Sequence, residues 1–168
     1  MARSNGHDLP ILVVGGGIGG LVTAYALALK GFPVRVLEQA PEFKELGAGI
    51  QLGPNIFRAL EKIGLKDAIL ADAWVPTAME MRSALTGERV TQIPLGDAAQ
   101  ARFHQPYAVT HRADIHGTYL RACERNNLIS LETNQRVDAV HQDDDHVALT
   151  LQSGEEIKGR ALIGCDGL

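Results

Sequence analysis

The chain has 168 residues, 45% of them hydrophobic and 21% charged, and a formal net charge of −4. This composition suits a globular α/β protein, and the absence of a long basic stretch argues against a nucleic-acid partner. No apolar run approaches a membrane span and residues 1–8 are too polar for a secretory signal, so we expect a cytoplasmic protein without stable membrane association. Cys123 and Cys165 have neither metal-binding nor redox spacing, which predicts reduced core thiols.

The first predicted elements are a strand, a glycine turn and a helix. Residues 11–14 are the apolar run Ile-Leu-Val-Val, and a G-x-G-x-x-G arrangement follows, with Gly15, Gly17 and Gly20 in the three glycine positions. The first glycine permits the tight turn, the second lets the backbone approach a pyrophosphate, and the third lets helix and strand pack closely. The helix that follows, predicted by its apolar spacing, would offer unpaired N–H groups at its start to phosphate oxygens.

A second strand and an acidic residue complete the pattern of a dinucleotide-binding unit. Gly31 is typical of a helix C-terminus, and residues 33–38 read as a buried strand that ends in Glu38. Glu38 lies 18 residues beyond Gly20, where a carboxylate can accept hydrogen bonds from both ribose hydroxyls of an adenosine. Because all these features occur in order, the sequence predicts dinucleotide binding, which an ordinary glycine-rich turn would not explain.

Beyond residue 40 the predicted elements are shorter and richer in strands. Alternating polar and apolar residues indicate the strands, and clusters of Gly, Asp and Ser indicate the turns. In order, we expect a glycine-rich segment at 47–55, a helix at 56–63, a hairpin of strands 79–82 and 89–93, a polar loop at 97–105, a strand at 107–110, a helix at 113–125, and strands at 128–133, 136–140, 147–152 and 160–164. Asp166 follows the last strand, where ligands of open α/β sheets gather.

Four blocks of the sequence resemble, in order, the N-terminal part of the single-component FAD-dependent aromatic hydroxylases (group A flavoprotein monooxygenases), most closely those acting on salicylate and 3-hydroxybenzoate. The blocks are residues 15–20, Glu38 with its strand, 47–55 together with 111–114, and 164–167. The resemblance implies a Rossmann-type FAD-binding domain with the glutathione-reductase-like fold and part of a β-rich substrate domain. In that plan residues 1–78 and 107–168 form the FAD-binding domain, and residues 79–106 begin an inserted substrate-domain sheet.

The resemblance also implies which residues bind the cofactor. They are Gly15, Gly17, Ile18, Gly19, Gly20, Glu38, Gln39, Gly47, Ala48, Gly49, Gln51, Arg112 and Asp166. The glycine turn would hold the FAD pyrophosphate and Glu38 the adenosine ribose, while the segment from Gly47 would pass near the flavin. Arg112 would reach the pyrophosphate–ribityl region and Asp166 the ribityl chain. Gln39 stands where the family often has a basic residue, which leaves the adenine-side contacts open.

Some of these residues also have a plain structural interpretation. Arg112 is consistent with a solvated cation, Asp166 with a turn residue, and Asp114 with a helix N-terminal cap or dipole partner. Three histidines fall within thirteen residues, the last being His116, but their spacings match no compact ligand pattern. We therefore predict no metal site.

The resemblance implies an activity for the parent enzyme. NADH or NADPH would reduce a noncovalently bound FAD, and the flavin C4a-hydroperoxide formed with O₂ would hydroxylate a small phenolic acid of the salicylate or 3-hydroxybenzoate type. The family continues for more than the length of this chain beyond Leu168, into most of the substrate sheet and a dimer surface. We therefore assign no catalytic residue here, and expect these 168 residues alone to be inactive and the parent to be a homodimer.

Two alternatives stay open at this point. The chain could be a nucleotide-binding fragment without turnover, whose interfaces would be exposed apolar surface. It could also belong to another FAD oxidoreductase of the same fold. A disulfide reductase is disfavoured because the sequence has no C-x-x-C pair.

Overall fold

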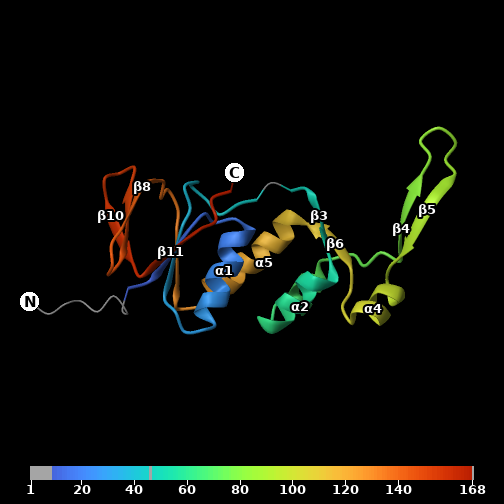
Figure 1. The fold of residues 1–168 in the computed structure, drawn as a ribbon, viewed down its shortest axis with the longest axis horizontal. Helices are drawn as coiled ribbons and strands as arrows, with labels where there is room; N and C mark the ends of the chain where they lie inside the picture. Colours follow the sequence, from blue (N-terminus) through green and yellow to red (C-terminus); the bar gives the residue numbers. More distant parts are fainter. Residues whose placement is uncertain (1–8, 46, 168) are drawn as a thin grey trace, which may run out of the picture. The chain divides into compact units, whose positions relative to one another are not determined.

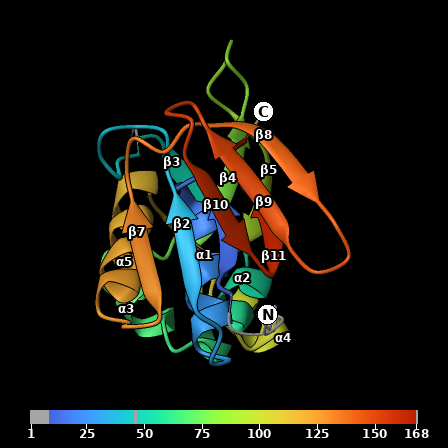
Figure 2. The ribbon, with the colours of Figure 1, turned by 90° about the vertical axis from the view of Figure 1, so that its left-hand side faces the viewer.

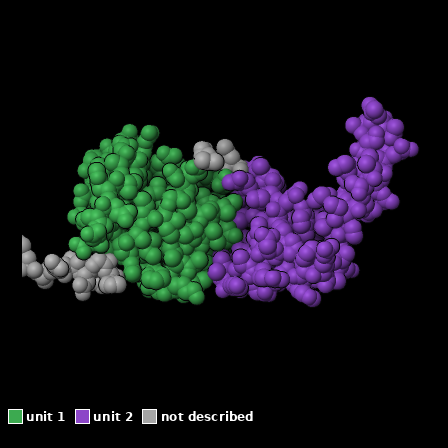
Figure 3. All heavy atoms as spheres, in the orientation of Figure 1, with its two compact units in different colours: residues 1–45, 116–168 green, residues 46–115 purple. Residues whose placement is uncertain are grey.

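The computed structural model describes residues 9–45 and 47–167. It divides the chain into unit 1, made of residues 1–45 and 116–168, and unit 2, made of residues 46–115 (Figure 3). The polar N-terminal stretch of residues 1–8, Leu46 and Leu168 lie outside the described residues. The predicted plan of a FAD-binding domain interrupted by residues 79–106 concerns a longer enzyme, and it stays a prediction.

Unit 1 is built on a parallel four-stranded sheet with the order β11-β1-β2-β7. Its strands are β1 (Ile11–Val14), β2 (Val34–Leu37), β7 (Ile129–Glu132) and β11 (Ala161–Gly164). All three pairings are parallel, and Val14 is in register with Leu37 on one side and Gly164 on the other. The carboxyl ends of the strands therefore meet at one edge, as predicted for a Rossmann-type fold.

Two helices cover one face of this sheet (Figure 1). They are α1 (Ile18–Ala28) and α5 (Arg112–Glu124). Val13, Val34 and Val36 point to this face and pack with Ala24 of α1. The Cys123 Sγ of α5 lies 3.3 Å from the Leu21 carbonyl oxygen of α1, which joins the two helices in the core.

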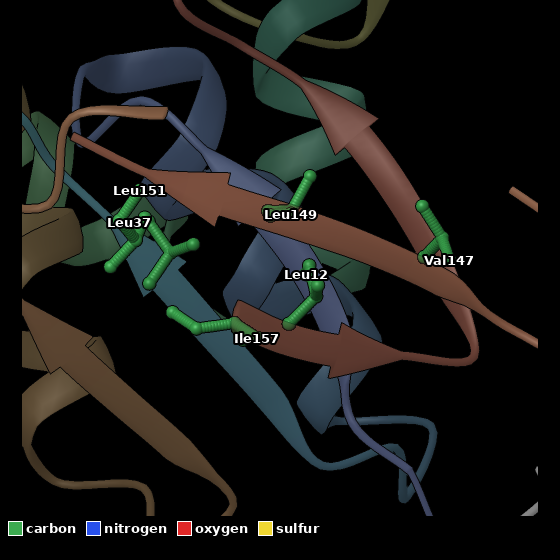
Figure 4. Packing of buried hydrophobic residues seen from close by; sticks show 6 residues of the cluster. All are labelled: Leu12, Leu37, Val147, Leu149, Leu151 and Ile157. Carbon is green, nitrogen blue, oxygen red and sulfur yellow. The ribbon is translucent and has the colours of Figure 1, made fainter. Parts of the chain in front are cut away.

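A three-stranded antiparallel sheet covers the opposite face (Figure 2). It consists of β8 (Val137–Gln142), β9 (Val147–Leu151) and β10 (Glu156–Gly159). Leu12 and Leu37 alternate with the valines of their strands, so their side chains meet Leu149, Leu151 and Ile157 on this side (Figure 4). The sequence predicted β8 and β9 but not β10, whose four residues pair antiparallel with β9.

Unit 2 contains two separate two-stranded sheets and three helices. Its elements are β3 (Gly49–Leu52), α2 (Pro54–Lys62), α3 (Lys66–Ala71), β4 (Ala78–Arg82), β5 (Arg89–Pro94), α4 (Asp97–Phe103) and β6 (Ala108–His111). β4 pairs with β5 as the predicted hairpin, and β3 pairs antiparallel with β6. Phe57 and Leu60 bury the apolar side of α2, which gives way to Gly64 in a left-handed conformation (φ 72°).

The structure corrects two expectations for this unit. The segment 97–105, predicted to be a polar loop, forms α4, because Ala99 is buried and Asp97 lies in the first turn, where a carboxylate complements the helix dipole. The glycine-rich segment at 47–55 contains β3, because a distant strand supplies its hydrogen-bond partners. None of the described helices has the length and apolarity that crossing a bilayer requires.

Candidate cofactor site

The glycine turn lies at the carboxyl edge of the parallel sheet in unit 1. The Gly15 N–H donates to the Leu37 carbonyl at 2.8 Å, and the Cys165 N–H donates to the Val14 carbonyl at 2.7 Å. The segments that follow β1, β2 and β11 are thus tied to one another. The structure brings the glycine turn, Glu38 with Gln39, and Asp166 to one edge, which is where open α/β sheets bind ligands.

The three motif glycines are needed for different reasons. Gly15 has φ +103°, and a Cβ there would overlap the Cys165 carbonyl. A Cβ on Gly20 would overlap the Gly15 carbonyl oxygen. Gly17 has an ordinary φ of −73°, and the nearest atom to a Cβ there would be Glu45 Oε2 at 3.9 Å. The fold therefore requires glycine at positions 15 and 20, but nothing in the described chain requires it at position 17.

The start of α1 offers donors to an anion. The first helical hydrogen bond runs from the Leu21 N–H to the Gly17 carbonyl at 3.0 Å. The N–H groups of Gly17, Ile18 and Gly19 therefore have no helical acceptor. None of the residues of the first turn is acidic. This arrangement suits a phosphate group.

Glu38 is fixed beside this turn by two main-chain donors. Its carboxylate accepts from the Gly16 N–H at 2.6 Å and from the Ala40 N–H at 2.8 Å. Each carboxylate oxygen can accept more than one hydrogen bond, so Glu38 keeps capacity for ribose hydroxyls. Gln39 is exposed next to it, and Asp166 is exposed at the end of β11.

The other predicted residues lie in unit 2, and Arg112 among them is the first residue of α5. The Arg112 N–H donates to the Ala48 carbonyl at 2.9 Å, directly after the β3–β6 ladder. Gln51 lies in the same ladder, and its Oε1 accepts from the Tyr107 hydroxyl at 2.6 Å. A Cβ on Gly47 or Gly49 would meet nothing within 4 Å, so here too the described chain gives no packing reason for glycine.

Two residues that shape the turn, Gly16 within it and His116 of α5, could not be found from the sequence pattern. His116 is 3% exposed, and its Nε2 lies 2.8 Å from the Gly16 carbonyl oxygen. Gly16 is not one of the three motif glycines, yet a Cβ on it would overlap the Phe43 ring. His116 was considered only as one of three histidines near each other in sequence, and spacing alone does not reveal a contact made across 100 residues. In the described part of the chain no group of three metal-ligating side chains gathers.

Comparison with known proteins identifies the family. A family model described as a FAD binding domain matches residues 8–168. The chain belongs to this family. It is 46% identical over 164 residues to a 3-hydroxybenzoate 6-hydroxylase of Polaromonas naphthalenivorans, covering 98% of this chain and 41% of the relative. It is 37% identical over 158 residues to a 6-hydroxynicotinate 3-monooxygenase of Bordetella bronchiseptica, covering 94% of this chain and 40% of the relative.

Solved structures support the same assignment. The Klebsiella pneumoniae HpxO complexed with FAD superposes with a TM-score of 0.82 at 27% identity, covering 95% of this chain and 40% of that one. Throughout these comparisons the chain spans about two fifths of the length of the relatives it matches. The expected fold class and the resemblance to the N-terminal part of FAD-dependent aromatic hydroxylases are therefore confirmed, and FAD is the cofactor of the family.

The turn in unit 1 fits the FAD of this family on its own geometry. It has a helix start whose first N–H groups have no helical acceptor, a carboxylate held at the end of the neighbouring strand, and a glycine at position 17, where an added Cβ would meet no atom closer than Glu45 Oε2 at 3.9 Å. A dinucleotide needs these three features for its pyrophosphate, its ribose and the close approach of the backbone.

Proposed function

We propose that this chain is the FAD-binding portion of an NAD(P)H-dependent monooxygenase that hydroxylates a small aromatic acid. The observation that carries the proposal is Gly17, the second glycine of the motif, placed at the N-cap of α1, where the first N–H groups have no helical acceptor and an added Cβ would meet no main-chain atom within 4 Å. In a dinucleotide-binding turn this glycine lets the backbone approach the pyrophosphate.

In this proposal each predicted residue has a part in holding FAD. The N–H groups of Gly17, Ile18 and Gly19 bind the pyrophosphate, Glu38 binds the adenosine ribose, and Asp166 binds the ribityl chain. Gly15 and Gly20 shape the turn, and Gln39 lies at the adenine side. The residues implied for the flavin end are Gly47, Ala48, Gly49, Gln51 and Arg112. When bound, the flavin supplies electron transfer and oxygen activation, while this chain binds and orients it, and no catalytic side chain is assigned.

The names of the relatives support the proposed substrate class. Those named 3-hydroxybenzoate 6-hydroxylase, 6-hydroxynicotinate 3-monooxygenase and 3-amino-4-hydroxybenzoate 2-monooxygenase share an aromatic acid that carries a hydroxyl group. We propose a substrate of this class, of the 3-hydroxybenzoate or salicylate type, with O₂ as co-substrate and NADH or NADPH as the donor. We also propose a homodimer for the intact protein, although one solved relative is described as tetrameric, so a native mass measurement will decide.

The experiment uses the purified intact protein. Denaturation should release all of the flavin into the supernatant, which tests noncovalent FAD. With NADH or NADPH and 3-hydroxybenzoate or salicylate, a dihydroxylated product should form in step with donor consumption. Flavin that stays with the precipitate contradicts the noncovalent assignment. Donor oxidation that yields only hydrogen peroxide with every hydroxylated aromatic acid contradicts the proposed substrate class.

A further inference from the structure

We propose that His116 is a positioning residue of the cofactor loop, which aims the Gly17 N–H at the FAD pyrophosphate by holding the Gly16 carbonyl. This inference rests on the proposed binding of FAD at the turn. His116 itself is buried in α5 and contacts the loop, and no contact between its ring and the cofactor is needed for this role.

The first step is the direction of the hydrogen bond. A carbonyl oxygen can only accept, so the His116 Nε2 at 2.8 Å must carry the proton and donate it. Among the described residues no main-chain N–H donates to the Gly16 oxygen, because the helical ladder starts one residue later with Leu21 N–H to Gly17. The imidazole therefore satisfies a buried acceptor that α1 itself leaves unpaired.

The second step is the geometry of the peptide group. The described chain contains no cis peptide bond, so the Gly16–Gly17 peptide is trans. In a trans peptide the C=O and the following N–H point in opposite directions. A Gly16 carbonyl turned toward His116 of α5 therefore turns the Gly17 N–H away from that ring. At Gly17 an added Cβ would meet no atom closer than Glu45 Oε2 at 3.9 Å, so no main-chain atom of the described chain blocks this side of the turn.

The preceding peptide group is fixed from the other side. The Gly16 N–H donates to Glu38 at 2.6 Å, and the Gly15 carbonyl oxygen of the same peptide lies against Gly20, where a Cβ would overlap it. Two consecutive peptide planes are thus set by an acid at the end of β2 and a histidine in α5. Both residues lie far from the turn in sequence, at separations of 22 and 100 residues.

The test compares four forms of the intact apoprotein in FAD titrations followed by flavin fluorescence. His116→Met fills a similar volume without a donor, and His116→Gln restores an N–H at a similar reach. Cys123→Ala is the matched control, because Cys123 is fully buried in the same helix and contacts α1 at Leu21, not at the turn. Urea unfolding of each apoprotein gives the accompanying loss of stability.

We expect His116→Met to raise the Kd for FAD at least tenfold, which is the scale of one lost hydrogen bond. His116→Gln, which restores a donor, should have a Kd within about threefold of the wild type. Cys123→Ala should leave the Kd within about threefold even where its loss of stability equals that of His116→Met. Equal affinities of wild type and His116→Met overturn the inference. So does a Cys123→Ala variant that loses as much affinity as His116→Met at the same stability.

A second measurement reads the hydrogen bond directly in the wild type. In apoprotein labelled with ¹⁵N-histidine, the wild type should show a protonated Nε2 for His116, and the signal is assigned by its loss in His116→Gln, whose folding the urea transition checks. An unprotonated Nε2 at this position overturns the inference. A wild type that takes up no FAD at all contradicts the proposed function instead, so the two failures are distinguishable.

Discussion

Substitution of Gly17 by alanine separates the demands of the ligand from the demands of the fold. Its φ of −73° and ψ of −175° are open to any residue, and the added methyl would have no neighbour closer than Glu45 Oε2 at 3.9 Å. The apoprotein should therefore be about as stable as the wild type, because the gain of about 0.4–1 kcal/mol from restricting the unfolded chain is opposed by the preference of the N-cap position for glycine over alanine. In the complex the methyl would lie where the pyrophosphate approaches. Displacing one or two charge-assisted hydrogen bonds, at roughly 1.5–3 kcal/mol each, should cost about 100-fold in affinity or more.

The assay pairs FAD titration with thermal unfolding in the absence and presence of FAD. The wild type should be stabilised by about 2.7 kcal/mol when FAD is present at about 100 times its Kd, whereas Gly17→Ala should gain almost nothing at the same concentration. Gly15→Ala, at φ +103° and against the Cys165 carbonyl, should instead destabilise the apoprotein itself. Gly117→Ala is the control, because its methyl would meet only the far end of a flexible Arg121. A Gly17→Ala protein with wild-type affinity for FAD would refute the assignment of the turn.

Three further outcomes are expected. Glu38→Gln should weaken FAD binding about tenfold, because it removes charge from the ribose acceptor, whereas Gln39→Ala should have little effect in the same titration. Burial raises the pKa of the Cys123 thiol to about 12, so the folded chain keeps a proton that the unfolded chain loses above pH 9. As the pH rises from about 9 toward 12, the free energy of unfolding should thus fall less in Cys123→Ala than in the wild type. The Arg35 hydrogen bonds at 2.8 and 2.7 Å hold the pKa of Glu132 below its usual range. Glu132→Gln should therefore cost roughly 1 kcal/mol of stability near neutral pH in urea unfolding, and this difference should vanish as acid protonates the wild-type carboxylate. A difference that persists in acid would contradict that cause.

The elements that could be predicted from the sequence share a local cause. β1, α1 and β2 were expected close to their observed bounds, because each is marked by its own apolar spacing and by glycines at its ends. The β4–β5 hairpin was also predicted, since its turn and both strands are contiguous in sequence. The short β3 and β10 were missed because their strand character comes from the partners β6 and β9, and not from their own composition.

The cofactor turn also combines features that are local in sequence with features that depend on tertiary packing. The sequence by itself determined the local elements, a strand, three spaced glycines, a helix and an acid at the next strand end, and it predicted from their order that they form a dinucleotide site. Only the tertiary structure decided which motif glycines the fold requires, because that depends on the carbonyls packed against Gly15 and Gly20, whereas an added Cβ on Gly17 would meet no atom closer than Glu45 Oε2 at 3.9 Å. It also decided that His116 of α5 holds the loop, since a hydrogen bond between residues 100 positions apart exists only after the helix has packed beside the turn.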